Sequence, residues 1–106
     1  MVHTTVTIVA PPAQKAEILR TLRALLAPTR VEPGCLRCQL FENAEHAHAF
    51  LLVEEWATDI DFRRRLRSDS YMQLLKLMEL SSEPPDIRFL VVTEIRGMDA
   101  IHAART

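Results

Sequence analysis

The spacing of apolar residues changes several times along the chain, which predicts alternating strands and helices. Residues 2–10 are rich in β-branched side chains and alternate between apolar and polar, so we expect a strand that ends at Pro11 and Pro12. Between residues 13 and 27 the apolar side chains recur at helical spacing instead, which predicts a helix that Pro28 stops.

Two further helices are indicated by residues suited to capping. Thr58 or Asp59 can begin a helix that runs to about Leu66, and Ser68 can begin the next one, because their side chains accept hydrogen bonds from the first helical amides. The residues of the second helix that we expect to point inward are Tyr71, Leu74, Leu75 and Met78.

The complete order is strand, helix, strand, strand, helix, strand, which is the ferredoxin-like βαββαβ plan. It predicts an α+β fold with a four-stranded antiparallel sheet and both helical crossovers on one face. We expect one domain over residues 1–106, in which residues 97–106 form a short helix, a flexible frayed end or an arm onto a neighbouring molecule. The later strands are expected over residues 35–42, 48–57 and 87–96.

The third strand is apolar on both sides, which predicts a partner for the sheet. Phe50 and Leu52 point one way, whereas Leu51 and Val53 point the other way, so the face without helices is apolar whichever pair it carries. Leaving such side chains in water would forfeit roughly 1.5–3 kcal/mol for each one. A second copy of the same sheet is the simplest cover, so we expect a two-fold homodimer packed sheet to sheet.

Composition narrows the classes of function. The chain has 106 residues, 48% of them hydrophobic, and a formal net charge of −1, so neither nucleic acid nor an anionic membrane is expected as a partner. No apolar stretch approaches the roughly 20 residues that span a bilayer, and no signal-peptide pattern is present at the N-terminus, which predicts a cytoplasmic protein. Only two glycines occur, and this argues against a glycine-rich phosphate loop.

Trp56 and His3 are the first candidates for a site. A tryptophan at the end of an apolar strand either belongs to the core or lines a pocket and stacks on a flat ligand; both can hold. His3 shares its strand face with Thr5 and Thr7, which makes a polar lane across the sheet. This lane faces either a pocket or the rim of the dimer.

Arg65 and Tyr71 are the second pair of candidates. The arginines near residue 65 spread around their helix and are typical of a solvated face, but Arg65 is suited to turn inward and hold an anionic or enolate oxygen. The Tyr71 phenol can donate or accept a hydrogen bond there. Glu54 and Glu55 flank Trp56 on opposite faces, so one of these carboxylates must lie near apolar surface and needs a partner or a raised pKa.

Cys35 and Cys38 form a CxxC pattern that we interpret as structural. Three positions apart on a strand, the two thiols are expected to face opposite sides, where they can neither bridge nor grip one metal ion. His46 and His48 share a face at the hairpin, where they either bind a metal ion weakly or, as is more common, are simply solvated. We therefore expect free thiols, no metal site and no bound cofactor.

Three motifs, in this order and spacing, are similar to those of the antibiotic biosynthesis monooxygenase family over about residues 2–96. The first is the TRVEPGC stretch of residues 29–35, before the second predicted strand. The second is the apolar strand that ends in EEW at Trp56, and the third is the LRSDSY stretch of residues 66–71.

This resemblance implies a dimeric α/β barrel with a pocket between sheet and helices in each subunit. Characterised relatives oxygenate flat phenolic or quinol-type substrates without metal or flavin, or cleave haem. Many members carry a histidine where this chain has Arg65. The haem-degrading members have an asparagine on the first strand, where this chain has Val6 and Thr7, and a histidine further along the helix, near Leu74; the resemblance therefore disfavours haem.

Two functions follow from these observations. The first is a cofactor-independent monooxygenase in which Trp56 stacks on a small phenol or quinol, Arg65 and Tyr71 steady its anion, and His3 accepts the proton. The second is a non-catalytic module for small-molecule binding or dimerisation, which the missing histidine favours.

Overall fold

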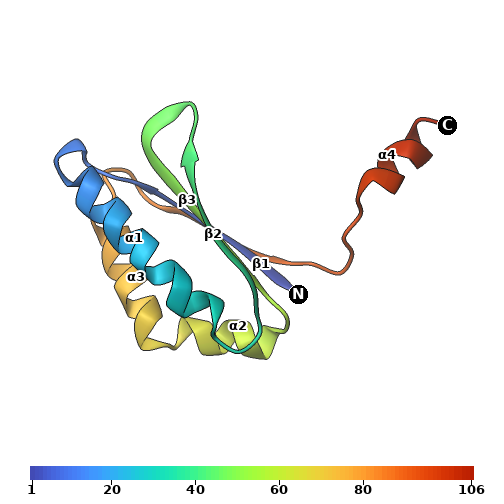
Figure 1. Cartoon of the computed structure of the whole chain (residues 1–106), viewed down its shortest axis with the longest axis horizontal. Helices are drawn as coiled ribbons and strands as arrows, with labels where there is room; N and C mark the ends of the chain where they lie inside the picture. Colours follow the sequence, from blue (N-terminus) through green and yellow to red (C-terminus); the bar gives the residue numbers. More distant parts are fainter.

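A computed structural model describes residues 1–106 as one antiparallel sheet with helices on one face (Figure 1). The strand order is β2-β3-β1-β4, which confirms the ferredoxin-like α+β plan. The elements are β1 (Val2–Val9), the 3₁₀ turn η1 (Pro12–Gln14), α1 (Lys15–Arg30), β2 (Cys35–Asn43), β3 (His46–Trp56), α2 (Asp59–Leu66), α3 (Asp69–Glu79), β4 (Asp86–Val91) and α4 (Met98–Ala104).

The main core lies between the sheet and the pair α1 and α3. In the pairing of β1 with β3, Val6 lies opposite Leu52 and Ile8 opposite Phe50, and all four side chains are buried on the helix side. Because strand residues alternate between faces, Thr5 and Val53, which pair with each other, lie on the face without helices, called here the open face. The remaining core residues include Ile18, Leu22, Leu25, Leu74, Leu77 and Met78.

Three sequence expectations are wrong in detail. α1 continues through Pro28 to Arg30, because the two residues after the proline keep their backbone N–H donors, although Pro28 lacks its own and its ring crowds the carbonyl four residues earlier. Leu75 is 41% exposed, and Leu77 is buried in its place, since position 77 stays on the same helical stripe as Leu74. β4 ends at Val91, which pairs with Val2, the first residue of its neighbour β1, instead of continuing to residue 96.

A β-bulge in β2 overturns the expectation for the cysteines. Cys35 pairs with Trp56 and Arg37 with Glu55, so Leu36 is an extra residue in the ladder. The extra residue shifts the alternation, and both Cys35 and Cys38 contact the apolar core on the helix side. Both thiols are free.

The segment after β4 leaves the body of the protein. Residues 97–106, which the sequence left unassigned, contain the short helix α4, and Figure 1 shows this helix well away from the sheet and the other helices. Every helix in the structure is too short or too polar to cross a bilayer.

Candidate functional site

Three buried side chains meet between β3 and α2. Arg65 is 2% exposed and Glu54 is 4% exposed, and they form a two-pronged ion pair: Nε donates to Oε1 at 3.0 Å and Nη2 donates to Oε2 at 3.1 Å. The indole Nε1 of Trp56 donates to the same Glu54 Oε1 at 3.1 Å. Glu54 is therefore the carboxylate near apolar surface, and Arg65 is its partner.

The other end of the Arg65 guanidinium is also occupied by protein groups. Its Nη1 donates to Ser70 Oγ at 2.7 Å and to Glu32 Oε2 at 3.3 Å. The Arg65 Cζ atom lies 5.2 Å from the centroid of the Tyr71 ring, a cation–π distance. This one side chain thus joins β3, α2, α3 and the turn before β2.

The electrostatics of the network follow from burial and from Glu54. Burial alone would lower the pKa of Arg65, but the hydrogen bonds and charge of Glu54 outweigh it and leave that pKa raised. Burial, followed by the Glu54 charge, raises the pKa of Tyr71, although Arg65 opposes this. An ordinary tyrosine is already neutral at pH 7, and the raised pKa keeps the Tyr71 phenol protonated to still higher pH. Burial also raises the pKa of Glu32, despite the nearby Arg65.

Local sequence explains how α2 and α3 present these groups. Thr58 Oγ1 accepts a hydrogen bond from the Asp61 amide at 3.1 Å, and Ser68 Oγ accepts one from the Tyr71 amide at 3.2 Å. Both are N-caps, so each helix begins at a fixed residue and Arg65 and Tyr71 take fixed directions. The hydrogen bond from Thr58, supported by Arg64, lowers the pKa of Asp61.

His3 lies on the open face, on the other side of the sheet from Trp56. Its Nδ1 is 2.8 Å from Glu55 Oε2, and the two residues are directly paired between β1 and β3. Arg37 of β2 and Leu90 of β4 are their neighbours in register. The polar lane predicted from the sequence is thus part of the face that no helix covers.

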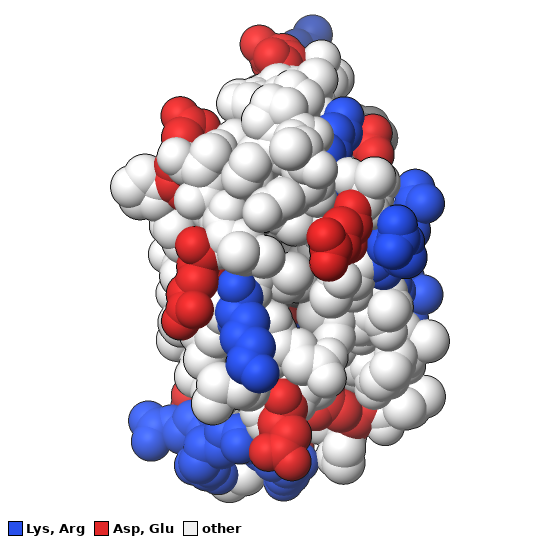
Figure 2. All heavy atoms as spheres, turned by 90° about the vertical axis from the view of Figure 1, so that its left-hand side faces the viewer, with Lys and Arg blue, Asp and Glu red and all other residues white.

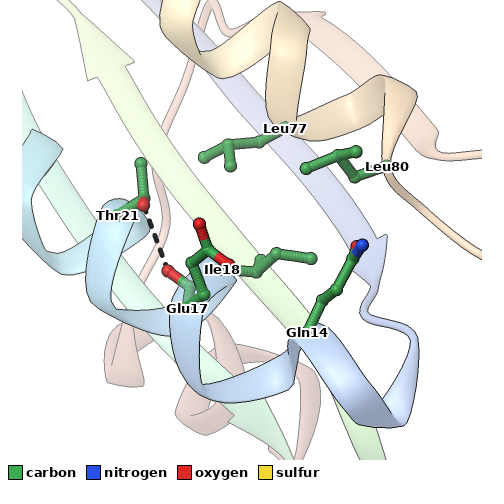
Figure 3. A pocket seen from close by; sticks show the side chains of 6 residues that line it. All are labelled: Gln14, Glu17, Ile18, Thr21, Leu77 and Leu80. Carbon is green, nitrogen blue, oxygen red and sulfur yellow. Dashed lines mark hydrogen bonds between the residues drawn. The ribbon is translucent and has the colours of Figure 1, made fainter.

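A groove of about 290 Å³ lies between α1 and α3 (Figure 3). Ile18, Leu77 and Leu80 supply its apolar lining. Its polar lining includes Glu17 and Thr21, but the Thr21 hydroxyl donates to the Glu17 backbone carbonyl at 3.1 Å and is engaged within its own helix. None of the predicted site residues lines this groove.

The surface carries both signs of charge. Figure 2 shows the end of the molecule nearest the start of α1, where acidic and basic residues are interspersed around uncharged surface, and basic ones gather toward the lower end. The exposed arginines of α2 are paired: Arg63 Nε lies 2.7 Å from Asp59 Oδ2, and Arg64 Nη1 lies 2.8 Å from Asp61 Oδ1. No group of three or more histidine, cysteine or acidic side chains is placed to hold a metal ion.

The structure brings together three of the four predicted site residues. Trp56, Arg65 and Tyr71 belong to one buried network, whereas His3 is separated from them by the sheet. Sequence reasoning recognised that Glu54 or Glu55 needed a partner but did not identify it. It also missed Glu32 and Ser70, the other two partners of Arg65. Glu32 is far from Arg65 in the sequence, and Ser70 is a residue type that is common at the start of a helix, so neither one carries a local signal of this role.

Comparisons with known proteins agree with this fold. The structure superposes on a Deinococcus radiodurans protein, named as a candidate antibiotic biosynthesis monooxygenase, with a TM-score of 0.84 over 92% of this chain and 98% of that one, at 21% identity. PA3566 from Pseudomonas aeruginosa gives a TM-score of 0.75 at 28% identity, over 88% of this chain and 94% of that one.

An uncharacterized protein of Synechocystis sp., sll1783, is 28% identical over 76 residues, or 72% of this chain. The chain spans about half, 48%, of that protein's length. The family model named antibiotic biosynthesis monooxygenase matches residues 1–77, which include Trp56, Arg65 and Tyr71. The chain belongs to the antibiotic biosynthesis monooxygenase family.

Proposed function

We propose that the protein is a cofactor-independent monooxygenase that acts on a small phenol or quinol. The observation that carries this proposal is the buried group of Trp56, Tyr71 and Arg65 on the helix side of a family fold. In the reaction, a base removes the phenolic proton, and the resulting electron-rich anion reduces O2 directly. One oxygen atom is added to the ring as a carbonyl and the other leaves as water, and the ring, which is oxidised to a quinone, supplies all four electrons.

The aromatic residues supply the binding surface in this proposal. Trp56 is 1% exposed, so a ligand reaches it only if a neighbour moves. Phe62 packs beside Trp56, and its ring meets that of Phe89 at 4.9 Å in an edge-to-face contact. Phe89 is 45% exposed on the edge strand β4, so we expect its displacement, together with that of Phe62, to open a route to the indole.

Arg65 and Tyr71 have different roles in this proposal. The guanidinium already makes four hydrogen bonds to protein groups, so its role is to position Trp56 through Glu54. Tyr71, a neutral phenol at neutral pH, donates a hydrogen bond to the phenolate oxygen. His3 accepts the proton only if the ligand binds between the sheets of two subunits.

Oxygen consumption tests the proposal. Purified protein, treated with EDTA and without added flavin, is given a panel of phenols and hydroquinones, and O2 uptake is measured together with the oxidised product. We expect turnover that falls at least tenfold in Trp56→Phe. The His3→Ala variant decides on which face the reaction takes place: unchanged turnover assigns it to the helix side. Absence of uptake across the panel would rule the enzyme out.

The second candidate function is a small-molecule binding module without catalysis. A specific observation favours it: Trp56 has no free general base beside it. Both carboxylate oxygens of Glu54 already accept hydrogen bonds from Arg65, and His3 lies on the other side of the sheet. This function predicts that apolar aromatic ligands raise the melting temperature without O2 uptake. Stabilisation together with product formation would argue against it.

We also propose that two chains pack through their open faces. Phe41 and Leu90, which are 43% and 51% exposed, lie on this face, and it also carries the half-buried pair of His3 and Glu55. Packing two such faces would bury this apolar surface. Sedimentation equilibrium should give twice the mass of the 12.1 kDa chain, and a folded monomer at micromolar concentration would contradict the dimer.

A further inference from the structure

Glu32 is the member of the Arg65 network that keeps contact with water. Its side chain is 25% exposed, whereas those of Arg65 and Glu54 are 1% and 5% exposed. Its Oε2 atom accepts a hydrogen bond from Arg65 Nη1 at 3.3 Å, which is longer than the usual hydrogen bond between two charged groups. Its Oε1 atom has no partner within the protein. One oxygen of this carboxylate is therefore free to accept a proton.

The turn that carries Glu32 is fixed to the end of β3 that carries Trp56. The Cys35 amide donates to the Glu32 carbonyl at 3.1 Å, and Gly34, with a φ of +80°, takes the left-handed position of a type II turn. The Ala57 amide donates to the Gly34 carbonyl at 2.8 Å, and Cys35 pairs with Trp56 between β2 and β3. Glu32 and the indole consequently lie at the same end of the sheet.

Glu32 also lies close to the group that binds the phenolic oxygen in the proposed reaction. That group is Tyr71, whose ring centroid is 5.2 Å from the Arg65 Cζ atom, and Glu32 contacts the Nη1 atom of the same guanidinium. The phenol of Tyr71 comes from α3 and the carboxylate of Glu32 comes from the turn before β2. A ligand oxygen bound beside Arg65 can therefore meet both.

The other carboxylates near this end of the sheet have no free oxygen or face elsewhere. Both oxygens of Glu54 accept hydrogen bonds from Arg65. Both oxygens of Asp61 also accept hydrogen bonds, and they lower its pKa, which makes it a weaker base. Glu55 pairs with His3 on the open face. Glu32 is the carboxylate that remains.

The charges around Glu32 favour its taking up a proton. Burial raises the pKa of Glu32, Arg65 opposes this, and the charge of Glu54 adds to it. Cys35, the titratable neighbour on β2, is a neutral thiol because burial raises its own pKa. Two carboxylates share one guanidinium here, so a proton on Glu32 leaves a neutral pair of Glu54 and Arg65. A base works best when its pKa approaches the pH at which it operates.

We propose that Glu32 is the general base of the monooxygenase reaction and that its Oε1 atom takes the proton of the phenol bound by Tyr71. This inference rests on the proposed function and supplies the proton acceptor that is missing beside Trp56. The phenolic O–H bond breaks, its electron pair stays on the phenolic oxygen, and a new O–H bond forms on Oε1. The exposed side of Glu32 then releases the proton to water, which restores the carboxylate for the next turnover.

The pH dependence of O2 uptake tests this role. The parent protein should lose activity as pH falls and Glu32 becomes protonated, because a carboxylic acid cannot accept the phenolic proton. Glu32→Gln should lower kcat at least tenfold and should lack this acidic limb. Glu83→Gln is the matched control, because the Glu83 side chain is 62% exposed and lies outside the Arg65 network, so it should keep the parent profile.

Two further measurements distinguish a base from a structural role. A ring-fluorinated phenol ionises at lower pH than phenol and depends less on a base, so Glu32→Gln should lose less activity with it than with phenol. Formate should restore part of the activity of Glu32→Ala, since it can supply a carboxylate in the vacated space. Equal losses with both phenols, together with no rescue by formate, would overturn the proposal.

The same experiment separates this inference from the function on which it rests. If the parent protein consumes O2 and Glu32→Gln matches its rate and pH profile, Glu32 is not the base and the monooxygenase stands. If the parent protein consumes no O2 with any phenol, both proposals fail.

Discussion

Arg65 and Glu54 are joined by two parallel hydrogen bonds inside a protein of only 106 residues, and the same carboxylate also holds the indole of Trp56. Such a buried pair gives little net stability, because burying two charges is about as costly as their attraction is favourable. The pair acts mainly by fixing the relative positions of the groups that it joins. The pair fixes the direction of Trp56 and ties α2 to β3.

Removing one member of this pair should be far more harmful than removing both. Arg65→Met leaves the buried Glu54 carboxylate without an opposite charge, and we expect it to lower the free energy of unfolding by about 3–5 kcal/mol. The double variant Glu54→Leu/Arg65→Met should recover most of that loss. Urea denaturation monitored by Trp56 fluorescence measures both.

Arg63→Met is the control for charge removal on the same helix. Its guanidinium pairs with Asp59, but both side chains are more than half exposed, so the expected loss is below about 1 kcal/mol. Equal losses for Arg63→Met and Arg65→Met would show that burial of the Glu54–Arg65 pair does not increase the free-energy cost of removing one of its members.

Gly34 should not tolerate a side chain. Its φ is +80°, and an added Cβ would overlap the carboxyl group of Asp61. That carboxyl is held by Thr58 and Arg64, so it cannot move aside freely. We expect Gly34→Ala to lose roughly 1–2 kcal/mol from the left-handed backbone conformation, and more from the overlap.

The other glycine provides the comparison. Gly97 has open space around its Cα and a negative φ, so Gly97→Ala should change the melting temperature little. Thermal unfolding of the two variants beside the parent protein measures the difference. A Gly34→Ala variant as stable as Gly97→Ala would mean that the turn before β2 can rearrange.

The two cysteines should be unreactive in the folded protein. Burial, followed by the charge of Glu54, raises the pKa of Cys38 to about 12, and burial also raises the pKa of Cys35. At pH 8 the reactive thiolate of Cys38 is therefore on the order of 10⁻⁴ of the total. A thiol-specific dye should label Cys35 slowly and Cys38 hardly at all, whereas both react in urea. Rapid native labelling of Cys38 would contradict its placement in the core.

Tyr71 gives a spectroscopic test of the pH dependence, because it is the only tyrosine in the chain. Its pKa is raised in the folded state, so the folded protein keeps the phenolic proton at pH values where the unfolded chain has released it. Folding stability should accordingly fall as pH rises above about 10, the ordinary value of tyrosine. Phenolate absorbance should appear at higher pH in the native protein than in urea, and coincident titrations would exclude burial of Tyr71.

The residues next to a position in the sequence were sufficient to predict the helix caps, but not the Glu54–Arg65 pair or the bulge at Leu36. Thr58 and Ser68 could be identified as caps because a cap involves only the next three residues. The pairing of Glu54 with Arg65 joins residues on different elements, and nothing near either one specifies the other. The bulge at Leu36 has no glycine to mark it, so the direction of Cys35 could not be inferred from alternation alone.

β1 lies in the middle of the sheet, between β3 and β4, although it precedes both in the chain. During synthesis, both edges of this strand emerge long before the strands that cover them. A segment rich in valine and threonine with two open edges is a template for pairing with other chains. Newly made molecules should therefore be most prone to aggregate before β3 has emerged, and binding by a chaperone at that stage would have its largest effect on yield.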